Sequence, residues 1–368
     1  MGGNRSALIL LICLAVTACA APYFDPPRPS EGFTNFETEP LRPLALSPDG
    51  NYLYALNTAD DRLEVFAAEA GSLTSLGEVR LGLRPIALTL RRPGELWVVN
   101  PLSDRVNVVD VSDPARPVVK RTLQVGDEPR GIVAAGPGRR WIMVAAAKRG
   151  DSLKPGIGRA HVWIFDAEQP EAEPRILTLF GTKPRALAVS PDGMTVYAGI
   201  FHSGTRTAIV GGIAAATIGR APVYGPDNRP QREEVPKAGT IVSQVEGRWR
   251  DFDGQDWSQL VPFELPDYDV FVIDAAGERP QVTERISGVG TTLFDIAVRP
   301  DNGEVWVSNT EALNRIPQEP RLRGRFVANR ITRLHRQGEG WSVAPVDLNR
   351  HVPEAAMPEP AGQRDKSL

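Results

Sequence analysis

Short apolar runs alternate with turn residues along most of the chain, and one such unit returns several times. Its clearest copies are Ala45-Leu-Ser-Pro-Asp-Gly-Asn-Tyr-Leu-Tyr-Ala-Leu-Asn57, Ala188-Val-Ser-Pro-Asp-Gly-Met-Thr-Val-Tyr-Ala198 and Ala297-Val-Arg-Pro-Asp-Asn-Gly-Glu-Val-Trp-Val-Ser-Asn309. In each copy an apolar run leads into a turn, and a second run rich in aromatic and β-branched residues follows. This pattern predicts a β-hairpin, because the turn residues supply the backbone angles of a tight reversal.

Looser copies of the unit, at residues 87–100 and 132–146, bring the number of repeats to five. The repeats begin near Arg42, Arg84, Arg130, Arg185 and Phe294. The first four starts are spaced by about 40 to 55 residues, which suits a four-stranded propeller blade. A third strand with alternating apolar and polar residues recurs, for example at residues 106–110 and 269–274. The sequence therefore predicts an all-β fold, a β-propeller of four-stranded blades with five blades present.

The last repeat already contains four candidate strands, so a strand from the N-terminal region has no three-stranded blade to complete. We therefore expect these blades to be an incomplete part of a seven-bladed ring, and a self-contained five-bladed ring is the alternative. An insertion at about 203–266 interrupts the fourth repeat. A loop of this length usually has a role, such as a lid or a partner surface. Its large aromatic residues either pack it onto the ring or form an exposed surface: Trp249, Phe252 and Trp257.

The N-terminus is typical of a targeting signal. Arg5 precedes an apolar stretch, residues 7–18, that is short for a membrane span and suits a signal peptide. Val16-Thr17-Ala18-Cys19 resembles the bacterial lipoprotein box, in which Cys19 would be acylated. Ala18-Cys19-Ala20 fits ordinary signal cleavage as the alternative.

These features predict four segments. They are a signal peptide at 1–19, a tether at 20–40, the propeller at 41–351 and a linker toward a further blade at 352–368. We expect the protein at the bacterial cell envelope, as a periplasmic or outer-membrane lipoprotein anchored to the membrane by lipid, or otherwise secreted.

The net charge, the cysteine content and the missing motifs limit the partners and the catalytic chemistry to be expected of this chain. The net charge of −3 gives no electrostatic reason to expect nucleic acid as a partner. Both cysteines, Cys13 and Cys19, lie in the predicted signal, so the mature chain would have no internal disulfide and no cysteine nucleophile. The sequence contains no P-loop, dinucleotide-binding, zinc-protease or serine-hydrolase motif. We assign no catalytic residue and no metal ligand, and we expect the chain by itself not to be an enzyme.

Arginine recurs at the start of the first strand in four of the five repeats, at Arg42, Arg84, Arg130 and Arg185. The innermost strands of a propeller surround its central channel, so equivalent positions would form a ring at one mouth. A ring of guanidinium groups would attract small anions that carry carboxylate or phosphate groups. The alternative is that these arginines pair with nearby acids, among them Glu39, Asp127 and Glu128.

Polar residues at the ends of the second strands should reach the same mouth. They are Asn57, Asn100 and Asn309, followed by Glu311, and His202 at the root of the insertion. We include all five in the candidate ligand-binding set. A structural role for the asparagines is the alternative, since Asn amides commonly bind turn backbone.

The second strands Tyr54-Ala-Leu-Asn57, Trp97-Val-Val-Asn100 and Trp306-Val-Ser-Asn309 resemble those of the YVTN-type β-propeller family. The resemblance covers roughly residues 35–350. More narrowly, the chain resembles bacterial envelope proteins in which such a propeller precedes a cytochrome c peroxidase-like haem domain. The segments that carry this second likeness are Gly126-Asp-Glu-Pro-Arg130, Gly181-Thr-Lys-Pro-Arg-Ala-Leu-Ala188, Ser308-Asn-Thr-Glu-Ala312 and Asp347-Leu-Asn-Arg-His351.

The sequence leaves three functions open, of which the first rests on the signal, the repeats and the absence of catalytic motifs, and the other two are implied by resemblance. The first is a binding or interaction scaffold on the cell envelope. The second is a lactonase-like hydrolase, in which similar Asn and Glu residues would hold Ca²⁺ in the channel. The third is the propeller half of a haem peroxidase-like redox protein that docks a haem domain as its partner. The chain contains no Cys-x-x-Cys-His, so we expect no cofactor bound by this chain itself.

Overall fold

The computed structural model describes residues 41–147, 160–204, 206–211, 240–251, 254–261, 267–313 and 327–350, and the backbone of 223–224 and 230–231. The described residues form β-strands and the short 3₁₀ turns η2 (Pro101–Ser103), η3 (Pro137–Arg139) and η4 (Ser258–Leu260). Among them, no helix is long and apolar enough to cross a membrane. The predicted all-β class is confirmed. The predicted signal peptide, tether and C-terminal linker lie outside the described residues.

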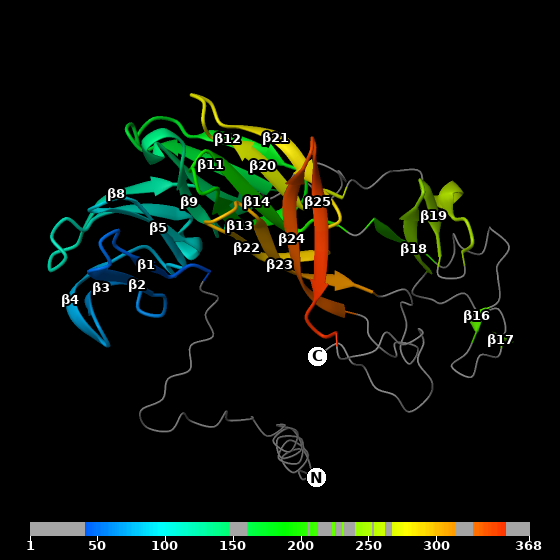
Figure 1. Ribbon diagram of the computed structural model, residues 1–368, viewed down its shortest axis with the longest axis horizontal. Helices are drawn as coiled ribbons and strands as arrows, with labels where there is room; N and C mark the ends of the chain where they lie inside the picture. The colour runs from blue at the N-terminus through cyan, green and yellow to red at the C-terminus, as the bar shows by residue number, and fades with distance from the viewer. Residues whose placement is uncertain are drawn as a thin grey trace, which may run out of the picture. The chain divides into compact units, whose positions relative to one another are not determined.

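Five four-stranded antiparallel blades follow one another along the chain (Figure 1). Blade 1 contains β1 (Leu44–Leu46), β2 (Tyr52–Asn57), β3 (Arg62–Glu69) and β4 (Ser72–Arg80). Blade 2 contains β5 (Ala87–Arg92), β6 (Glu95–Asn100), β7 (Arg105–Asp110) and β8 (Val118–Gln124). Blade 3 contains β9 (Ile132–Ala135), β10 (Trp141–Ala147), β11 (Ala160–Asp166) and β12 (Arg175–Leu179).

Blades 4 and 5 share one continuous sheet. Blade 4 contains β13 (Thr182–Val189), β14 (Thr195–His202), β20 (Val270–Asp274) and β21 (Gln281–Ile286). Blade 5 contains β22 (Thr292–Val298), β23 (Val305–Ala312), β24 (Val327–Gln337) and β25 (Gly340–Asp347). The two blades are joined through one residue pair, His202 with Thr292. The described blades match the five predicted from the repeat, and the total of seven stays a prediction.

The insertion has its own small sheets between β14 and β20. One contains β15 (Thr207–Val210), β18 (Thr240–Val245) and β19 (Arg248–Arg250), and the other pairs β16 (Val223–Tyr224) with β17 (Pro230–Gln231). Trp249 and Trp257 are buried together with Val210, Val242 and Val261. The two tryptophans thus form a core within the insertion, which neither sequence alternative described. Phe252 lies outside the described residues.

Each pair of successive blades buries one apolar cluster between them. Val65 meets Leu88 between blades 1 and 2, and Trp97 meets Ile142 between blades 2 and 3. Corresponding clusters lie between blades 3 and 4 and between blades 4 and 5. Alternate residues of a strand point to opposite faces of its sheet, so a blade with a neighbour on each side contributes to two clusters. Burial of these faces is the main source of stability.

No cluster of this kind joins blade 5 to blade 1 among the described residues. The exposed fraction of the side chain at one aromatic position of the repeat shows that blade 5 lacks such a cluster on one face. Tyr54, Trp97 and Tyr197 pair with Ala45, Thr89 and Ala188 in register, and Trp306 pairs with Ala297 in the same way. The first three are 3%, 0% and 7% exposed, because each packs against the next blade, whereas Trp306 is 37% exposed.

An aspartate before the third strand ties a blade to the connection that follows it. Asp61 accepts the backbone N–H of Arg84 at 2.6 Å, and Asp104 accepts that of Glu128 at 3.0 Å. Both aspartates have positive φ angles, which Asp tolerates better than most residues. In blade 4 the buried carboxylate of Asp269 accepts the N–H of Val289 at 2.6 Å. The same side-chain bond therefore recurs at three places in the repeat.

Candidate functional site

Two copies of the motif Gly-x-x-Pro-Arg lead into the innermost strands of blades 3 and 4. They are Gly126-Asp-Glu-Pro-Arg130 and Gly181-Thr-Lys-Pro-Arg185. In both, the charged residue before the proline, Glu128 or Lys183, has a positive φ angle. The two segments share this backbone conformation, and Glu128, Arg130, Lys183 and Arg185 line one cavity.

Gly131 allows the two innermost strands to approach each other closely. A Cβ atom added at this glycine would lie 2.5 Å from the carbonyl oxygen of Arg185. Real side chains do not tolerate that distance to backbone, so a larger residue would push blades 3 and 4 apart at this point. The glycine thus fixes the separation between Arg130 and Arg185.

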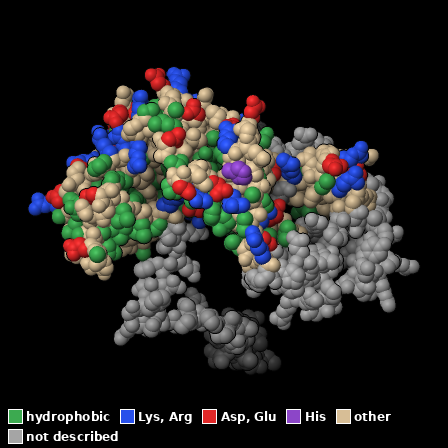
Figure 2. Space-filling model, in the orientation of Figure 1, with side chains coloured by type: hydrophobic (Ala, Val, Ile, Leu, Met, Phe, Trp, Pro, Cys, Tyr) green, Lys and Arg blue, Asp and Glu red, His purple; other side chains and the backbone are tan. Residues whose placement is uncertain are grey.

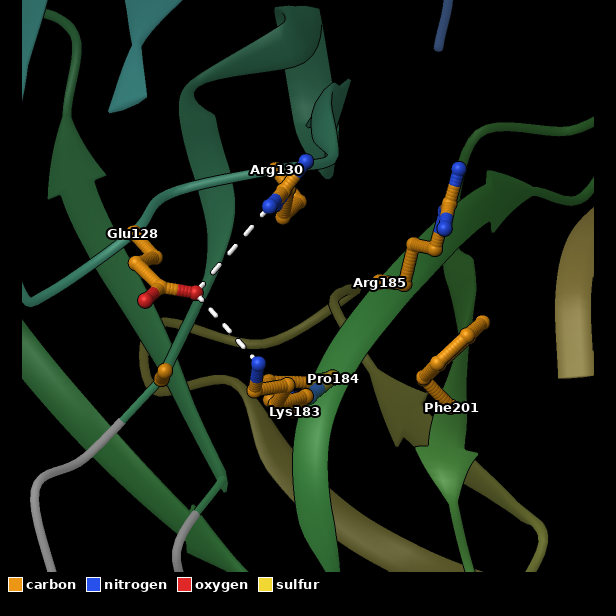
Figure 3. A pocket seen from close by; sticks show the side chains of 7 residues that line it. Glu128, Arg130, Lys183, Pro184, Arg185 and Phe201 are labelled. Atoms are coloured by element: carbon orange, nitrogen blue, oxygen red, sulfur yellow. Dashed lines mark ion pairs between the residues drawn. The ribbon is translucent and has the colours of Figure 1, made fainter. Parts of the chain in front are cut away.

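A cavity of about 160 Å³ lies between these segments. Figure 3 shows Glu128, Arg130 and Lys183 around it, with Arg185 and Phe201 on the blade 4 side. Ala147 and Pro184 are the other described residues that line it.

The cavity is electropositive. Of the described residues, three cationic side chains, Arg130, Lys183 and Arg185, line it together with the carboxylate of Glu128. Glu128 lies between two of the cations, 4.0 Å from Arg130 and 3.8 Å from Lys183. Pairs of this length at half-exposed side chains contribute little to stability. The carboxylate can therefore be displaced by an anion that offers more oxygen atoms.

Arg185 stands out among the cationic residues. Its guanidinium lies over the ring of Phe201, 5.2 Å from the ring centroid, a cation–π contact. Its Nε atom is buried and has no hydrogen-bond partner. An unsatisfied buried donor costs about 1–3 kcal/mol, so an acceptor that reached this atom would recover that cost. The side chain is held in position by the ring beneath it.

Arg42 has a different role. Its guanidinium pairs with Asp295 at 2.9 Å and also donates to the carbonyl oxygen of Ile296. The contact links the innermost strands of blades 1 and 5. For this residue the structure shows pairing with an acid, the alternative that the sequence left open, although the partner is not one of the acids named there.

Arg84 does not occupy the position equivalent to Arg42. The equivalent aromatic residues Tyr54 and Trp97 pair with Ala45 and Thr89. Arg42 lies three residues before Ala45. The residue three before Thr89 is Ile86, which is therefore the equivalent of Arg42. Arg84 comes two residues earlier, in the turn before β5, with a φ angle of 58°. Of the four aligned arginines, the structure brings only Arg130 and Arg185 into one cavity.

The three predicted asparagines bind within their own blades. Asn57 donates to Glu64. Asn100 is buried and donates to Asn107, and Asn309 is buried and donates to Thr332. Glu311 pairs with Arg330 at 2.7 Å. These four residues do not line the cavity. The amide of Asn100 also donates to the carbonyl oxygens of Val98 and Arg105, and that of Asn309 to the carbonyl oxygen of Val307, so both bind backbone as the structural alternative expects.

His202 lies at the end of β14, next to the cavity-lining Phe201, and its ring is 4.5 Å from the Phe201 ring. Partial burial, followed by the positive charge of Lys183, lowers the pKa of His202 below its ordinary value. Within the described ranges, no group of three or more His, Asp or Glu side chains could hold a metal ion. Cys19 lies outside those ranges.

Sequence reasoning missed Lys183 and Phe201 as site residues, and it took Glu128 only as a pairing partner for an arginine. A signal for two of them was present, because a charged residue precedes the proline in both copies of Gly-x-x-Pro-Arg. No comparable signal marked Phe201, which belongs to a different strand.

No protein-family model and no curated protein sequence matches the chain. Among solved structures, the chain is similar to Kuenenia stuttgartiensis hydrazine synthase, at 20% identity with a TM-score of 0.52. That alignment covers 87% of this chain and 70% of that one. The chain is also similar to a candidate 6-phosphogluconolactonase of Bacteroides uniformis, at 13% identity and a TM-score of 0.47, over 82% and 69% of the two chains. At such identity the first likeness supports the fold alone, and the chain is a β-propeller protein.

Proposed function

We propose that the protein is a binding module of the YVTN type that holds a small polyanion in the cavity between blades 3 and 4. The observation that carries this proposal is the buried, partnerless Nε of Arg185 beside two further cationic side chains. Guanidinium groups match carboxylate and phosphate oxygens in geometry, and each charge-assisted bond contributes about 1.5–3 kcal/mol. The cavity volume suits an anion of a few heavy atoms to about a dozen.

The ligand would bind by exchange with Glu128. One anionic group of the ligand bridges Arg130 and Lys183 in place of the carboxylate, and a second accepts from Nε of Arg185. Among the described lining residues no side chain carries a hydroxyl, thiol or imidazole group, and the two that could act as a base or nucleophile, Glu128 and Lys183, are paired with each other. Binding is therefore the function we propose for this cavity, in preference to lactone hydrolysis.

Titration calorimetry with pyrophosphate and citrate tests the cavity. We expect Arg185→Ala to weaken binding at least about tenfold, because one charge-assisted bond is lost. We expect Glu128→Gln to strengthen binding severalfold, because it removes the carboxylate that competes with the ligand. Arg84→Ala is the matched control, since it removes a predicted ring arginine that lies outside the cavity.

Absence of binding heat for the wild-type chain at millimolar anion would contradict the proposal. So would equal losses in the Arg185 and Arg84 variants, since a general charge effect would then explain the affinity.

We further propose that the module is held at the bacterial cell envelope by acyl chains on Cys19. The support is the sequence Val16-Thr17-Ala18-Cys19 after an apolar stretch. When the full chain is expressed in a bacterium with labelled palmitate, we expect label in the protein and its recovery with membranes. Cys19→Ser should abolish both, because the acylated thiol is removed, and Cys13→Ser should change neither. Label that persists in the Cys19 variant would rule the anchor out.

A further inference from the structure

The innermost strands of blades 4 and 5 each contain one extra residue at the same position of the repeat. In β13 the pairing with β14 shifts between Pro184 and Ala186, so Arg185 is the extra residue. In β22 the pairing with β23 shifts in the same way on either side of Phe294. Each lies three residues before the alanine that pairs with the aromatic residue of the second strand. A β-bulge bends its strand and redirects a side chain, and bulges are frequent beside binding sites.

The ring of Phe201 contacts both redirected side chains. Phe201 belongs to β14, whose end pairs with β13 and with β22. The guanidinium of Arg185 lies over this ring (Figure 3). The ring of Phe294 meets it in a T-shaped arrangement, with the centroids 5.6 Å apart and the planes at 77°. Aromatic pairs favour this geometry. The three side chains therefore form one continuous contact that leads from a cation to a second aromatic ring.

The bulge turns Phe294 out of the core that its strand otherwise joins. Its side chain is 38% exposed, whereas Leu293 and Ile296 of the same strand are fully buried. Phe201 is half-buried and lines the cavity of the proposed anion site. Aromatic surface is thus left uncovered directly beside the cationic side chains, where a ring attached to a bound anion can pack against it.

The charges around these rings do not oppose an anion. Asp295 follows Phe294 in the sequence, but its carboxylate is already paired with Arg42 at 2.9 Å. Figure 2 shows acidic and basic side chains interspersed over the visible face of the described blades. A broad basic surface on that face therefore does not choose among anions, and the choice depends on the groups at the cavity itself.

We propose that the anion held in the cavity carries an aromatic ring, which packs against Phe201 and Phe294. This inference rests on the proposed function and specifies its ligand as an aromatic ring that carries two anionic groups, such as carboxylates. The anionic groups bind the cationic side chains as described above, and the ring covers the exposed surface of Phe294. A flat aromatic ring gains from edge-to-face or offset contact with Phe294, which a saturated ring of equal charge does not. Phe294 is therefore the residue that determines specificity.

Titration calorimetry with two dicarboxylates of equal charge tests this inference. Isophthalate and cis-hexahydroisophthalate have the same acidic groups on a six-membered ring, and only the first ring is aromatic. We expect the wild-type chain to bind isophthalate about threefold to tenfold more tightly. Phe294→Leu should reduce this preference to less than about twofold, because leucine keeps apolar volume but offers no ring. Trp306→Leu is the matched control, since it removes an exposed aromatic residue of the same blade outside the cavity, and it should keep the full preference.

Pyrophosphate separates this inference from the proposed function. If pyrophosphate binds and the wild type binds both dicarboxylates equally, the cavity binds anions and the inference about the ring is wrong. This comparison does not depend on the folding of any variant. A preference that survives Phe294→Leu overturns the inference as well, and so does isophthalate binding that is unchanged in Arg185→Ala, because the ring then binds elsewhere. If none of the three anions binds, the proposed function fails and this inference fails with it.

Discussion

Replacement of Trp97 with alanine is expected to lower the free energy of unfolding by about 3–5 kcal/mol. Trp97 is fully buried between blades 2 and 3, and its ring centroid lies 6.2 Å from that of Phe165. Its indole N–H donates to Glu95 at 2.8 Å. The substitution removes a large apolar surface and one hydrogen bond to Glu95, and it leaves a cavity that the sheets cannot close. Urea unfolding followed by circular dichroism measures the loss.

Trp306→Ala is the matched comparison, because Trp306 occupies the same position of the repeat in blade 5. Its ring is more than a third exposed, so we expect a cost below about 1 kcal/mol. Equal costs for the two tryptophans would mean that Trp306 is covered in solution as Trp97 is.

Stability should fall as the pH rises from about 4 to about 7, through the carboxyl group of Asp269. Burial, followed by the charge of Asp267, raises the pKa of Asp269 from 3.8 to about 7. Between these values the folded chain keeps the proton and the unfolded chain has lost it, so unfolding releases a proton. A rise in pH then favours the unfolded state.

Asp269→Asn should remove this dependence, because the amide cannot ionise while its carbonyl oxygen still accepts the N–H of Val289. Relative to the wild type, the variant should gain on the order of 2–4 kcal/mol between about pH 4 and pH 7. Chemical unfolding at several pH values gives the difference. Asp104→Asn is the control, since it changes the equivalent carboxylate of blade 2 where burial is only partial. A constant difference between the Asp269 variant and the wild type would show that Asp269 does not titrate in this range.

Much of the fold could be predicted from the sequence, because the repeat encodes local structure. The Pro-Asp-Gly turn and the strands beside it specify a hairpin at each copy, and five copies gave five blades. Leu96–Val99 is a continuous apolar run, which is typical of a strand buried on both faces, and all four residues are buried. These features are determined by residues that lie close together in the sequence, so they can be predicted without knowledge of the tertiary structure.

Which residues lie together at the candidate site depends on the register of the strands in each blade, and the sequence specifies that register less well. Arg42-Pro43 and Arg84-Pro85 are the same dipeptide, so an alignment on identity matched them. The hairpin of blade 2 has one residue fewer between paired positions than that of blade 1, since seven residues lie between Thr89 and Trp97 and eight between Ala45 and Tyr54. Arg84 lies five residues before Thr89, whereas Arg42 lies three before Ala45, and this difference of two residues takes Arg84 out of the equivalent position.

Contacts that depend on side-chain direction, or on sheets outside the repeat, could not be predicted. Phe201 reaches Arg185 because β13 and β14 are paired neighbours, but its role as the ring beneath a guanidinium depends on side-chain direction. The tryptophans of the insertion were expected to face either the ring or solvent. Instead, both tryptophans are buried in a core within the insertion, because β15, β18 and β19 form a sheet that the repeat pattern does not describe.

The contact of Arg42 with Asp295 and Ile296 has a consequence for the order of folding. The apolar clusters join blades that are neighbours in sequence, so each can form as soon as its second blade has been synthesised. The contact between Arg42 and Asp295 spans 253 residues and must wait until blade 5 exists. During synthesis, the first four blades can therefore assemble in order at the ribosome while the first and last described blades are still apart.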